Sequence, residues 1–508
     1  MGLEKLRMKL MIEKIDAKIE QTFSNPLILL LLIFLAGFLL RLYFTPFDLP
    51  SRSQDAFYFI ITALSFQESF ENIGGRYFMW SGLLTIIFAP FHFVNYDGYF
   101  TILRVVSITL SSFSGLVLYL IAKQMMSKKF ALLSMAFFVI EPNIIENSIF
   151  GLSEPLFILL GLASFYFAIQ KNPKFIVFSF VFAGLAFDTR PNGIILLIVA
   201  LFSIYLRIRP RKEFIKLCIV GIACFLIVIV PLIVDFQDRL ASDLSKIIST
   251  GDQKLTPSFE HGSFILDNKY LGATITELIH LVRISVPYLG IFALFGFIIV
   301  LKKLNWHYKL IITTILLSLL VAIPQYTVSV EYRNLFLITP FFSLFAAIGI
   351  EHFAHDKKIK NILLVCLVLG LILVSFIFLT ERQPDSELIL EQERFGKFVV
   401  SNYEGRITTG NWNYILHNLS YPLSDSSLVL KIPDFVIHDL DEFVEYIVTN
   451  KIDYIIIDKE DQIRFAIFPD IYFNEEKYPF LKKIFDSDNN NYIKYRVKIF
   501  EVDYSKLE

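Results

Sequence analysis

The stretch LILLLLIFLAGFLLRLYF, residues 27–44, contains a single charged side chain, Arg41. Coiled into a helix, an apolar run of this length matches the hydrocarbon thickness of a bilayer. Comparable runs recur up to about residue 379, so we expect a polytopic α-helical membrane protein with roughly eleven spans. The other expected spans lie near 102–122, 130–149, 154–170, 174–189, 192–206, 215–235, 276–301, 309–328, 334–353 and 361–379.

The composition agrees with a membrane protein and excludes several other classes. The chain has 508 residues, 55% of them hydrophobic and 53 of them Phe, with a mean hydropathy of +0.58. A soluble protein of this length is far less apolar. The net charge of −1 provides no basic field for nucleic acid. The cysteines Cys218, Cys224 and Cys366 lie in apolar runs and are expected to be core residues, with no disulfide or metal role.

The distribution of basic residues orients the spans, because cytoplasmic loops are rich in Lys and Arg. The apolar run 78–94 is interrupted by Ala89-Pro90-Phe91. If this run crosses the membrane, every basic cluster from Lys123 onward faces away from the N-terminal tail. If it is a re-entrant or surface helix, all the clusters face the cytoplasm. We favour the second topology, which places 45–100, 236–275 and the C-terminal tail outside.

The chain changes character at Thr380. Residues 380–508 are polar and alternate β-rich runs, at 451–459 and 492–502, with a helical pattern at 440–450. This pattern predicts an extracytoplasmic soluble α/β domain with its own core. The expected organisation is a cytoplasmic tail (1–26), a transmembrane catalytic domain (27–379) and this external domain (380–508).

One short polar segment, SRSQDAFYF (51–59), follows the first span and carries Asp55. A carboxylate at the membrane surface suits a general base that removes a proton from an acceptor hydroxyl. The structural alternative is a solvated loop carboxylate or the N-cap of a helix starting at Ala56. Asp48 is a weaker candidate for the same role.

Three carboxylates, Glu141, Glu146 and Glu154, surround one external turn. Glu154 opens an apolar run, where a charged group lines a cavity or, alternatively, satisfies the helix dipole after an N-cap at Ser153. We favour a functional role for Glu154.

Three arginines are the candidate anion-binding groups. Arg190 lies between two expected spans, and Arg333 begins a late one. A guanidinium group at this depth suits a phosphate, and the alternatives are snorkelling or pairing with Asp188 and Glu331 respectively. Arg76 is a third external cation, equally suited to lipid headgroups. A divalent cation between Asp55 and Glu154 is chemically suitable, but no spacing specifies it and no metal ligand is predicted.

Several motifs occur in order along residues 27–353. They are Arg41-Leu42, Asp55 with Tyr58, Arg104-Val105-Val106-Ser107, Tyr119-Leu120-Ile121-Ala122-Lys123, Glu141-Pro142, Ser153-Glu154, Gly184-Leu185-Ala186, Arg190-Pro191-Asn192-Gly193, and Tyr332-Arg333 with Pro340. In this order they resemble the GT-C glycosyltransferases, nearest the family-39 type of protein O-mannosyltransferases and the aminoarabinose transferase of lipid A.

The resemblance implies many spans with juxtamembrane helices in the first external loop. It implies a polyprenyl- or dolichyl-phosphate-linked sugar donor and an inverting transfer on the extracytoplasmic face. Asp55 and Glu154 map to the catalytic acids, and Arg190 and Arg333 to the phosphate-binding cations. Three further residues are assigned to substrate binding, namely Tyr58, Arg76 and Glu141.

The chain departs from this family pattern at three places. Ala56 stands where many relatives carry a second acid, and Tyr77-Phe78 follows Arg76 where some relatives have Pro-Pro. The WWDxG signature of oligosaccharyltransferases is absent, and GNWNY (410–414) is only loosely similar to it.

We therefore expect a membrane glycosyltransferase that acts on a protein, lipid or glycan hydroxyl. A lipid or sugar transporter is the first alternative, but no repeated halves with broken helices are visible in the sequence. A non-catalytic subunit of envelope assembly is the second, and it predicts that Asp55 and Arg190 tolerate substitution.

Overall fold

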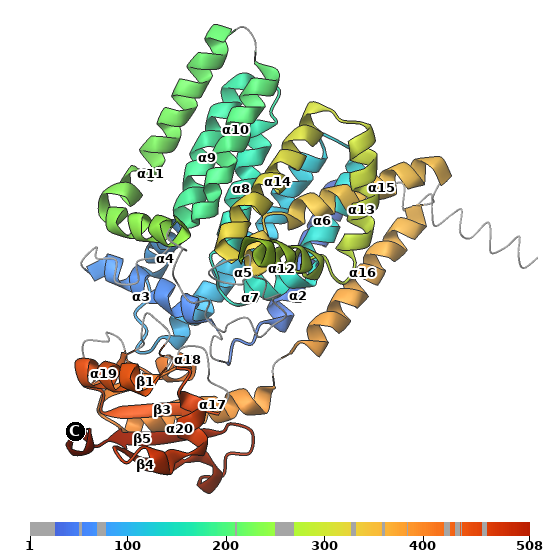
Figure 1. Ribbon diagram of the computed structural model, residues 1–508. Helices are drawn as coiled ribbons and strands as arrows, with labels where there is room; N and C mark the ends of the chain where they lie inside the picture. The colour runs from blue at the N-terminus through green and yellow to red at the C-terminus, as the bar shows by residue number, and fades with distance from the viewer. Residues whose placement is uncertain are drawn as a thin grey trace, which may run out of the picture.

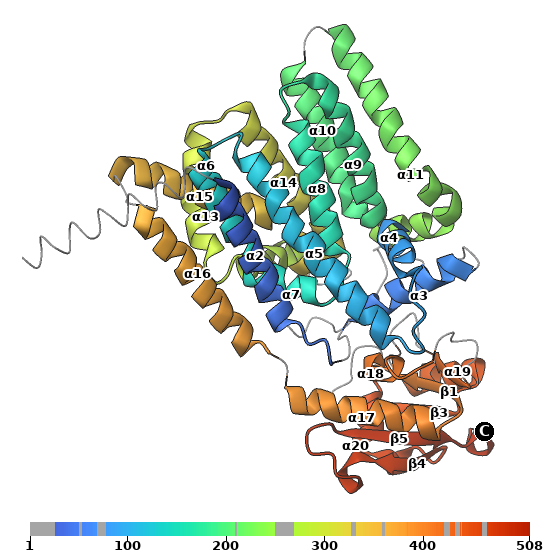
Figure 2. The same cartoon turned by 180° about the vertical axis from the view of Figure 1, so that it is seen from behind.

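The computed structural model describes residues 26–49, 53–68, 78–208, 211–248, 269–326, 332–357, 361–383, 385–420, 427–431, 437, 439–459 and 465–507. Views from two sides show a helical body with a small sheet domain at one end (Figures 1 and 2). The helices of the body are α2 (Pro26–Phe44), α3 (Gln54–Glu68), α4 (Phe78–Phe88), α5 (Asp97–Ala122), α6 (Lys128–Val139), α7 (Pro142–Ile149), α8 (Glu154–Ala168), α9 (Ile176–Thr189), α10 (Ile194–Arg207), α11 (Arg211–Ile248), α12 (Lys269–Arg283), α13 (Leu289–Lys302), α14 (Trp306–Tyr326), α15 (Thr339–Lys357) and α16 (Asn361–Glu381).

Five of the described helices contain an apolar stretch long enough to cross a bilayer, namely α2, α5, the first part of α11, α14 and α16. A sixth span results if α6 and α7, which meet at a bend of 51°, are counted together. Several other apolar helices are shorter, α8 with 15 residues among them. The structure therefore supports a multi-pass membrane protein, whereas the expected count of eleven spans is not confirmed.

The predicted span 276–301 is one place where the structure differs from expectation. It is divided between α12 and α13, which are separated by residues 284–288. The first half carries the polar residues Thr276, Glu277 and His280 on the buried face of α12. A helix with polar groups inside and apolar groups outside does not continue as a uniform span, and Pro287 lies in the break.

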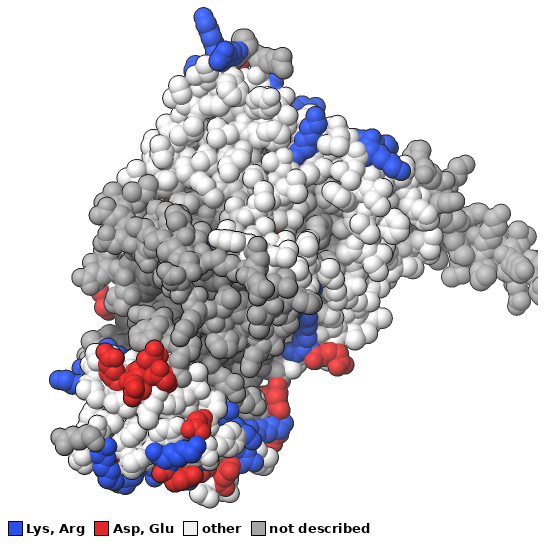
Figure 3. All heavy atoms as spheres, in the orientation of Figure 1, with Lys and Arg blue, Asp and Glu red and all other residues white. Residues whose placement is uncertain are grey.

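The basic clusters of the described residues lie at the end of the body opposite the sheet domain. The ends of α5, α8, α10 and α13 that lead into these clusters lie there in both ribbon views (Figures 1 and 2). On the face in Figure 3, Lys and Arg gather at this end, and among the described residues few charged side chains lie between it and the sheet. Helix α4, with 11 residues, is too short to span. The positive-inside rule then predicts that the basic end faces the cytoplasm.

The C-terminal part contains a five-stranded sheet in the order β2-β1-β3-β5-β4. Strand β1 pairs in parallel with β2 and β3, and β5 pairs antiparallel with β3 and β4. The predicted runs 451–459 and 492–502 contain β3 and β5, and the predicted helix 440–450 is α19. The elements are α17 (Ser386–Asn402), β1 (Gly405–Thr409), α18 (Asn413–Leu416), β2 (Leu428–Lys431), α19 (Leu440–Asn450), β3 (Tyr454–Asp458), α20 (Phe468–Phe473), β4 (Leu481–Asp486) and β5 (Val497–Val502).

Arg41, the single charge of the first apolar stretch, is fully buried between three helices. Its Nη1 donates to the carbonyl oxygens of Gly37, at 2.8 Å, and Val139, at 2.6 Å. Its Nε and Nη2 donate to Ser111 Oγ at 3.2 and 3.1 Å. Arg41 therefore joins α2 to α5 and α6, and its role in this arrangement is structural.

Arg104, the arginine of the third motif, holds the loop that leads to α3. Its Nη1 donates to the carbonyl oxygens of Pro46, at 2.7 Å, and Leu49, at 3.0 Å. These two bonds fix the path of the chain between the first span and the segment that carries Asp55.

Candidate active site

Four of the predicted site residues, Asp55, Glu154, Arg190 and Arg333, converge at one place. Asp55 lies in the first turn of α3, and Glu154 is the first residue of α8. Arg190 caps the C-terminal end of α9, and Arg333 lies in the short 3-10 helix η3 (Tyr332–Leu335). The four side chains come from four separate elements. Helices α3 and α8 begin at the site, and α9 ends there.

Ion pairs join the four residues into one network. Arg333 Nη2 lies 2.7 Å from Asp55 Oδ2, and Arg333 Nε lies 3.6 Å from Glu154 Oε1. Arg190 Nη1 donates to the same Glu154 Oε1. Arg333 therefore bridges the two carboxylates, and the two formal negative charges are matched by two positive ones.

The network has a buried half and a more accessible half. The side chains of Glu154 and Arg190 are 2% and 8% exposed. Those of Asp55 and Arg333 are 15% and 22% exposed. A ligand that approaches from solvent or from the membrane surface therefore meets Asp55 and Arg333 before the other pair.

One amide side chain contacts Arg190, and two others, one of them in the motif that begins with Arg190, pair with each other. Arg190 Nη2 donates to Asn334 Oδ1 at 2.9 Å. Asn192 Nδ2 donates to Gln325 Oε1 at 3.2 Å, and Gln325 Nε2 donates back to Asn192 Oδ1. Asn192 belongs to a motif noted in the sequence, whereas Asn334 and Gln325 were missed. The only sequence signal for Asn334 is that it follows Arg333.

Local sequence explains how the two buried charges reach the site. Arg190 is extended, with φ −155° and ψ 136°, because Pro191 disfavours a helical residue before it. Glu154 stands in the first turn of α8, where the helix dipole favours an anion. Ser153 makes no side-chain cap bond there, so the N-cap role that we considered for Ser153 is absent.

The three external carboxylates have three different partners. Glu141 is fully buried and caps α7, accepting from the backbone N–H of Ile144 at 2.8 Å and from Asn143 Nδ2 at 2.9 Å. Glu146 pairs with Arg382 Nη1 at 2.8 Å. Of the three, the described ion pairs connect Glu154 alone to the network.

Two other predicted residues lie elsewhere. The ring of Tyr58 packs edge-on against Trp412 of the C-terminal domain, with 5.7 Å between the ring centroids. Arg76 and the loop residue Glu331 lie outside the described residues. Asp48, the weaker candidate for the base, is exposed in the turn before α3.

One cation near the network was missed in the sequence. The guanidinium of Arg283, in α12, lies 4.7 Å over the ring of Tyr332, the residue before Arg333. Arg283 lies within the expected span 276–301, so a charge inside an apolar run was the sequence signal that could have identified it. Within the described ranges, no three His, Cys, Asp or Glu side chains are grouped so that they could hold a metal ion.

The overall fold resembles that of solved glycosyltransferase structures at low sequence identity. The oligosaccharyltransferase of Archaeoglobus fulgidus, solved with Zn and sulfate, has a TM-score of 0.60 at 10% identity, covering 85% of this chain and 68% of that chain. The same organism's oligosaccharyltransferase AglB, in complex with an inhibitory peptide and a dolichol-phosphate, has a TM-score of 0.59 at 10% identity, with 93% and 74% covered.

ArnT from Cupriavidus metallidurans, bound to undecaprenyl phosphate, has a TM-score of 0.59 at 10% identity, covering 95% of this chain and 99% of that chain. AglB and ArnT are GT-C glycosyltransferases, so the resemblance noted in the sequence is confirmed as a shared fold. No curated protein matches the chain by sequence.

A family model matches residues 81–402, which comprise most of the helical body and the first helix of the C-terminal domain. The description of this model is "Predicted membrane protein (DUF2079)". The chain belongs to this DUF2079 family of predicted membrane proteins.

Proposed function

We propose that this protein transfers a sugar from a polyprenyl-phosphate donor to a hydroxyl acceptor on the extracytoplasmic face, with inversion at the anomeric carbon. The observation that carries this proposal is the ion-pair network of Asp55, Glu154, Arg190 and Arg333 within a GT-C fold. Two solved proteins of this fold were obtained with dolichol-phosphate and with undecaprenyl phosphate, which supports a donor of the same chemical class here.

Arg333 is the proposed contact for the donor phosphate. It is the more exposed of the two arginines of the network, and its planar guanidinium matches phosphate oxygens. Charge develops on this phosphate as it leaves, and a fixed cation stabilises that charge. Arg190, held between Glu154 and Asn334, serves chiefly to orient Glu154, with phosphate contact as its secondary role.

Asp55 is the proposed base for the acceptor. The donor phosphate competes with Asp55 for Arg333, which leaves the carboxylate available to accept a proton. The acceptor oxygen then bonds to the anomeric carbon while the bond from that carbon to the phosphate oxygen breaks. The electron pair leaves with the phosphate and the acceptor proton moves to Asp55. Because this is a single displacement, the configuration inverts, and Glu154 orients the sugar or the acceptor.

The experiment is sugar release or transfer from radiolabelled polyprenyl-phosphate hexoses by the purified protein in detergent with lipid. Asp55→Asn should reduce turnover by about 10²–10⁴-fold, the usual contribution of a general base. Asp48→Asn is the matched control, because Asp48 is an exposed carboxylate in the segment that leads to α3, and it should keep the wild-type rate.

Each other outcome has a distinct meaning. Full turnover in Asp55→Asn would refute this base and direct the search to Asp48 or Glu154. If the folded wild-type protein turns over none of the donors, the transferase assignment is wrong and the transporter and assembly alternatives gain weight.

A further inference from the structure

The first turn of α3, which carries Asp55, packs against a tryptophan from the C-terminal domain. Trp412 is 3% exposed. Its ring meets Phe57 at 5.3 Å and Tyr58 at 5.7 Å between centroids, edge-on in both cases. Phe57 and Tyr58 are the second and third residues after Asp55, so Trp412 contacts the same helical turn that presents the carboxylate to Arg333.

A second contact fixes the same segment of the C-terminal domain to the helical body. His417 Nδ1 lies 2.6 Å from Asp97 Oδ1 at the start of α5. The His417 ring stacks on Phe100, with centroids 4.1 Å apart and planes at 18°. Residues 412–417 are therefore held at one end by α3 and at the other by α5.

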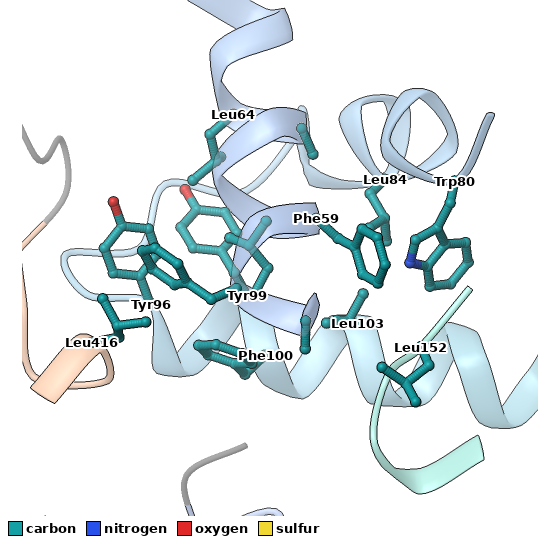
Figure 4. Close-up of a cluster of buried hydrophobic side chains, with 14 of the residues drawn as sticks. Phe59, Leu64, Trp80, Leu84, Tyr96, Tyr99, Phe100, Leu103, Leu152 and Leu416 are labelled. Atoms are coloured by element: carbon teal, nitrogen blue, oxygen red, sulfur yellow. The ribbon is translucent and has the colours of Figure 1, made fainter. Parts of the chain in front are cut away.

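Between these two contacts the two parts of the protein share one hydrophobic cluster. Phe57 and Tyr96 lie edge-on with centroids 5.0 Å apart, which joins α3 to the residue before α5. Figure 4 shows Leu416 of α18 beside Tyr96, and both side chains belong to this cluster. Movement of the 412–417 segment would therefore be transmitted directly to α3.

The beginning of α3 is held by the ion pair of Asp55 with Arg333 and by the packing of Phe57 and Tyr58 against Trp412. A helix leaves its first backbone N–H groups without intrahelical partners. Ala56 donates instead to the carbonyl of Ser53, at 3.2 Å. The position of this turn thus depends both on the partners of Asp55 and on what its aromatic side chains pack against. The buried indole Nε1 of Trp412 has no hydrogen-bond partner among the described residues, so this ring contributes through packing alone.

We propose that Trp412 is a positioning residue that holds Asp55 in its place opposite Arg333, so that the C-terminal domain completes the site. The effect on activity rests on the proposed function, in which Asp55 is the base. A displacement of about 1 Å at a reacting group can lower a rate by about 10²-fold. Loss of the indole should therefore lower turnover although Trp412 itself touches no reacting atom.

The first test measures the position of α3 without relying on activity. Hydrogen exchange of residues 54–68 is compared in wild type, Trp412→Ala and Trp412→Phe. Phe468→Leu is the matched control, since Phe468 is a buried aromatic of the same domain in a separate cluster. We expect faster exchange of α3 in Trp412→Ala only, with α8 and α9 unchanged. Equal protection of α3 in Trp412→Ala and wild type would overturn the proposal.

The second test is a double-mutant cycle in the sugar-transfer assay. Trp412→Ala should reduce kcat by about 10–10²-fold with the KM for the donor unchanged, and Trp412→Phe should restore most of the rate. In the Asp55→Asn background, Trp412→Ala should cause no further loss. An equal loss in both backgrounds would mean that Trp412 serves stability alone, which contradicts the proposal.

The two tests separate this inference from the proposed function. If Asp55→Asn retains full activity, the proposed base is wrong. The exchange experiment still decides whether Trp412 holds α3, because its readout does not depend on chemistry.

Discussion

At the scale of single residues, burial divides the two arginines of the site. Arg190 is nearly enclosed and has Glu154 and Asn334 as partners, whereas Arg333 is more exposed and spans two carboxylates. A buried charge whose partner is removed costs about 3–5 kcal/mol. Substitution of Arg190 should therefore lower the stability of the protein, whereas substitution of Arg333 should lower its activity.

Arg333→Lys tests this division. A lysine ammonium is a point charge and cannot span Asp55 and Glu154 as the planar guanidinium does. We expect kcat/KM for the donor to fall by about 10²–10³-fold, the cost of removing one group that stabilises developing charge. The melting temperature in detergent should change little.

Arg190→Lys is the matched comparison for that substitution. It should lower the melting temperature clearly, because Glu154 loses part of its buried pairing. If Arg333→Lys instead unfolds the protein while Arg190→Lys affects only the rate, the roles assigned to the two arginines must be exchanged.

The charged residues of this site could be predicted because charges beside apolar spans are costly and stand out. The amide side chains of the site could not be predicted in this way. Asn334 and Gln325 resemble any polar residue at a helix end, and only the folded chain brings them to Arg190 and Asn192. Glu141, which the sequence analysis assigns to substrate binding, is the buried N-cap of α7, a structural role that its sequence position did not indicate.

At the scale of elements, one carboxylate joins α17 to the segment before β5. Glu391 accepts from the backbone N–H groups of Ile493, Lys494 and Tyr495, at 2.8, 2.9 and 2.7 Å. Burial alone would raise the pKa of Glu391, but these three hydrogen bonds outweigh it and the net direction is below the ordinary value of 4.5.

This pKa shift predicts how α17 responds to acid. Because the folded pKa is lowered, the stabilisation is complete above pH 4.5 and is lost as the pH falls through the folded value. The protection factors of residues 491–497 in the full-length protein, which correct for the slower intrinsic amide exchange in acid, should fall as the pH is lowered below 4.5. In Glu391→Gln the free energy of opening of this segment at pH 7 should be lower by about 1.5–3 kcal/mol, because charge-assisted hydrogen bonds are lost. This free energy should also depend less on pH than in the wild type. A wild-type response identical to that of the variant would contradict the assignment.

The predictable elements were those with one uniform pattern. The apolar run of α2 and the amphipathic run of α19 appear where the sequence places them. The division of 276–301 into α12 and α13 was not anticipated, because hydropathy averaged over the run conceals the buried Glu277 and His280. The bend between α6 and α7 was not anticipated either, because the same average makes 130–149 look like one continuous span.

At the scale of the whole molecule, the basic end and the sheet domain lie at opposite ends of the helical body (Figures 1 and 2). The positive-inside rule therefore predicts that the site and the sheet domain lie on the extracytoplasmic side. This arrangement depends on α4 remaining at the surface, which its 11-residue length favours.

Cysteine labelling tests the orientation. With the three native cysteines replaced, Lys494→Cys in the sheet domain should react with a membrane-impermeant maleimide in intact cells. Lys303→Cys, at the end of α13, is the control and should react only after the cells are permeabilised. Both side chains are exposed, so access to the reagent decides the result. Labelling of Lys303→Cys alone in intact cells would reverse the proposed orientation.

The buried guanidinium of Arg41 has a consequence for how the protein is made. Every donor bond that it makes to another helix goes to α5 or α6, which emerge from the ribosome after α2. Arg41 lies in the last turn of α2, where an arginine without partners extends to the lipid headgroups and avoids the cost of about 2.5–3.5 kcal/mol that it has at a helix centre. Newly synthesised α2 should therefore rest at a shallower depth, with Arg41 near the lipid headgroups, until its later partners arrive. Biogenesis thus depends on the order of synthesis, and a nascent chain that stops before Ser111 would lack the oxygen that receives two of these bonds.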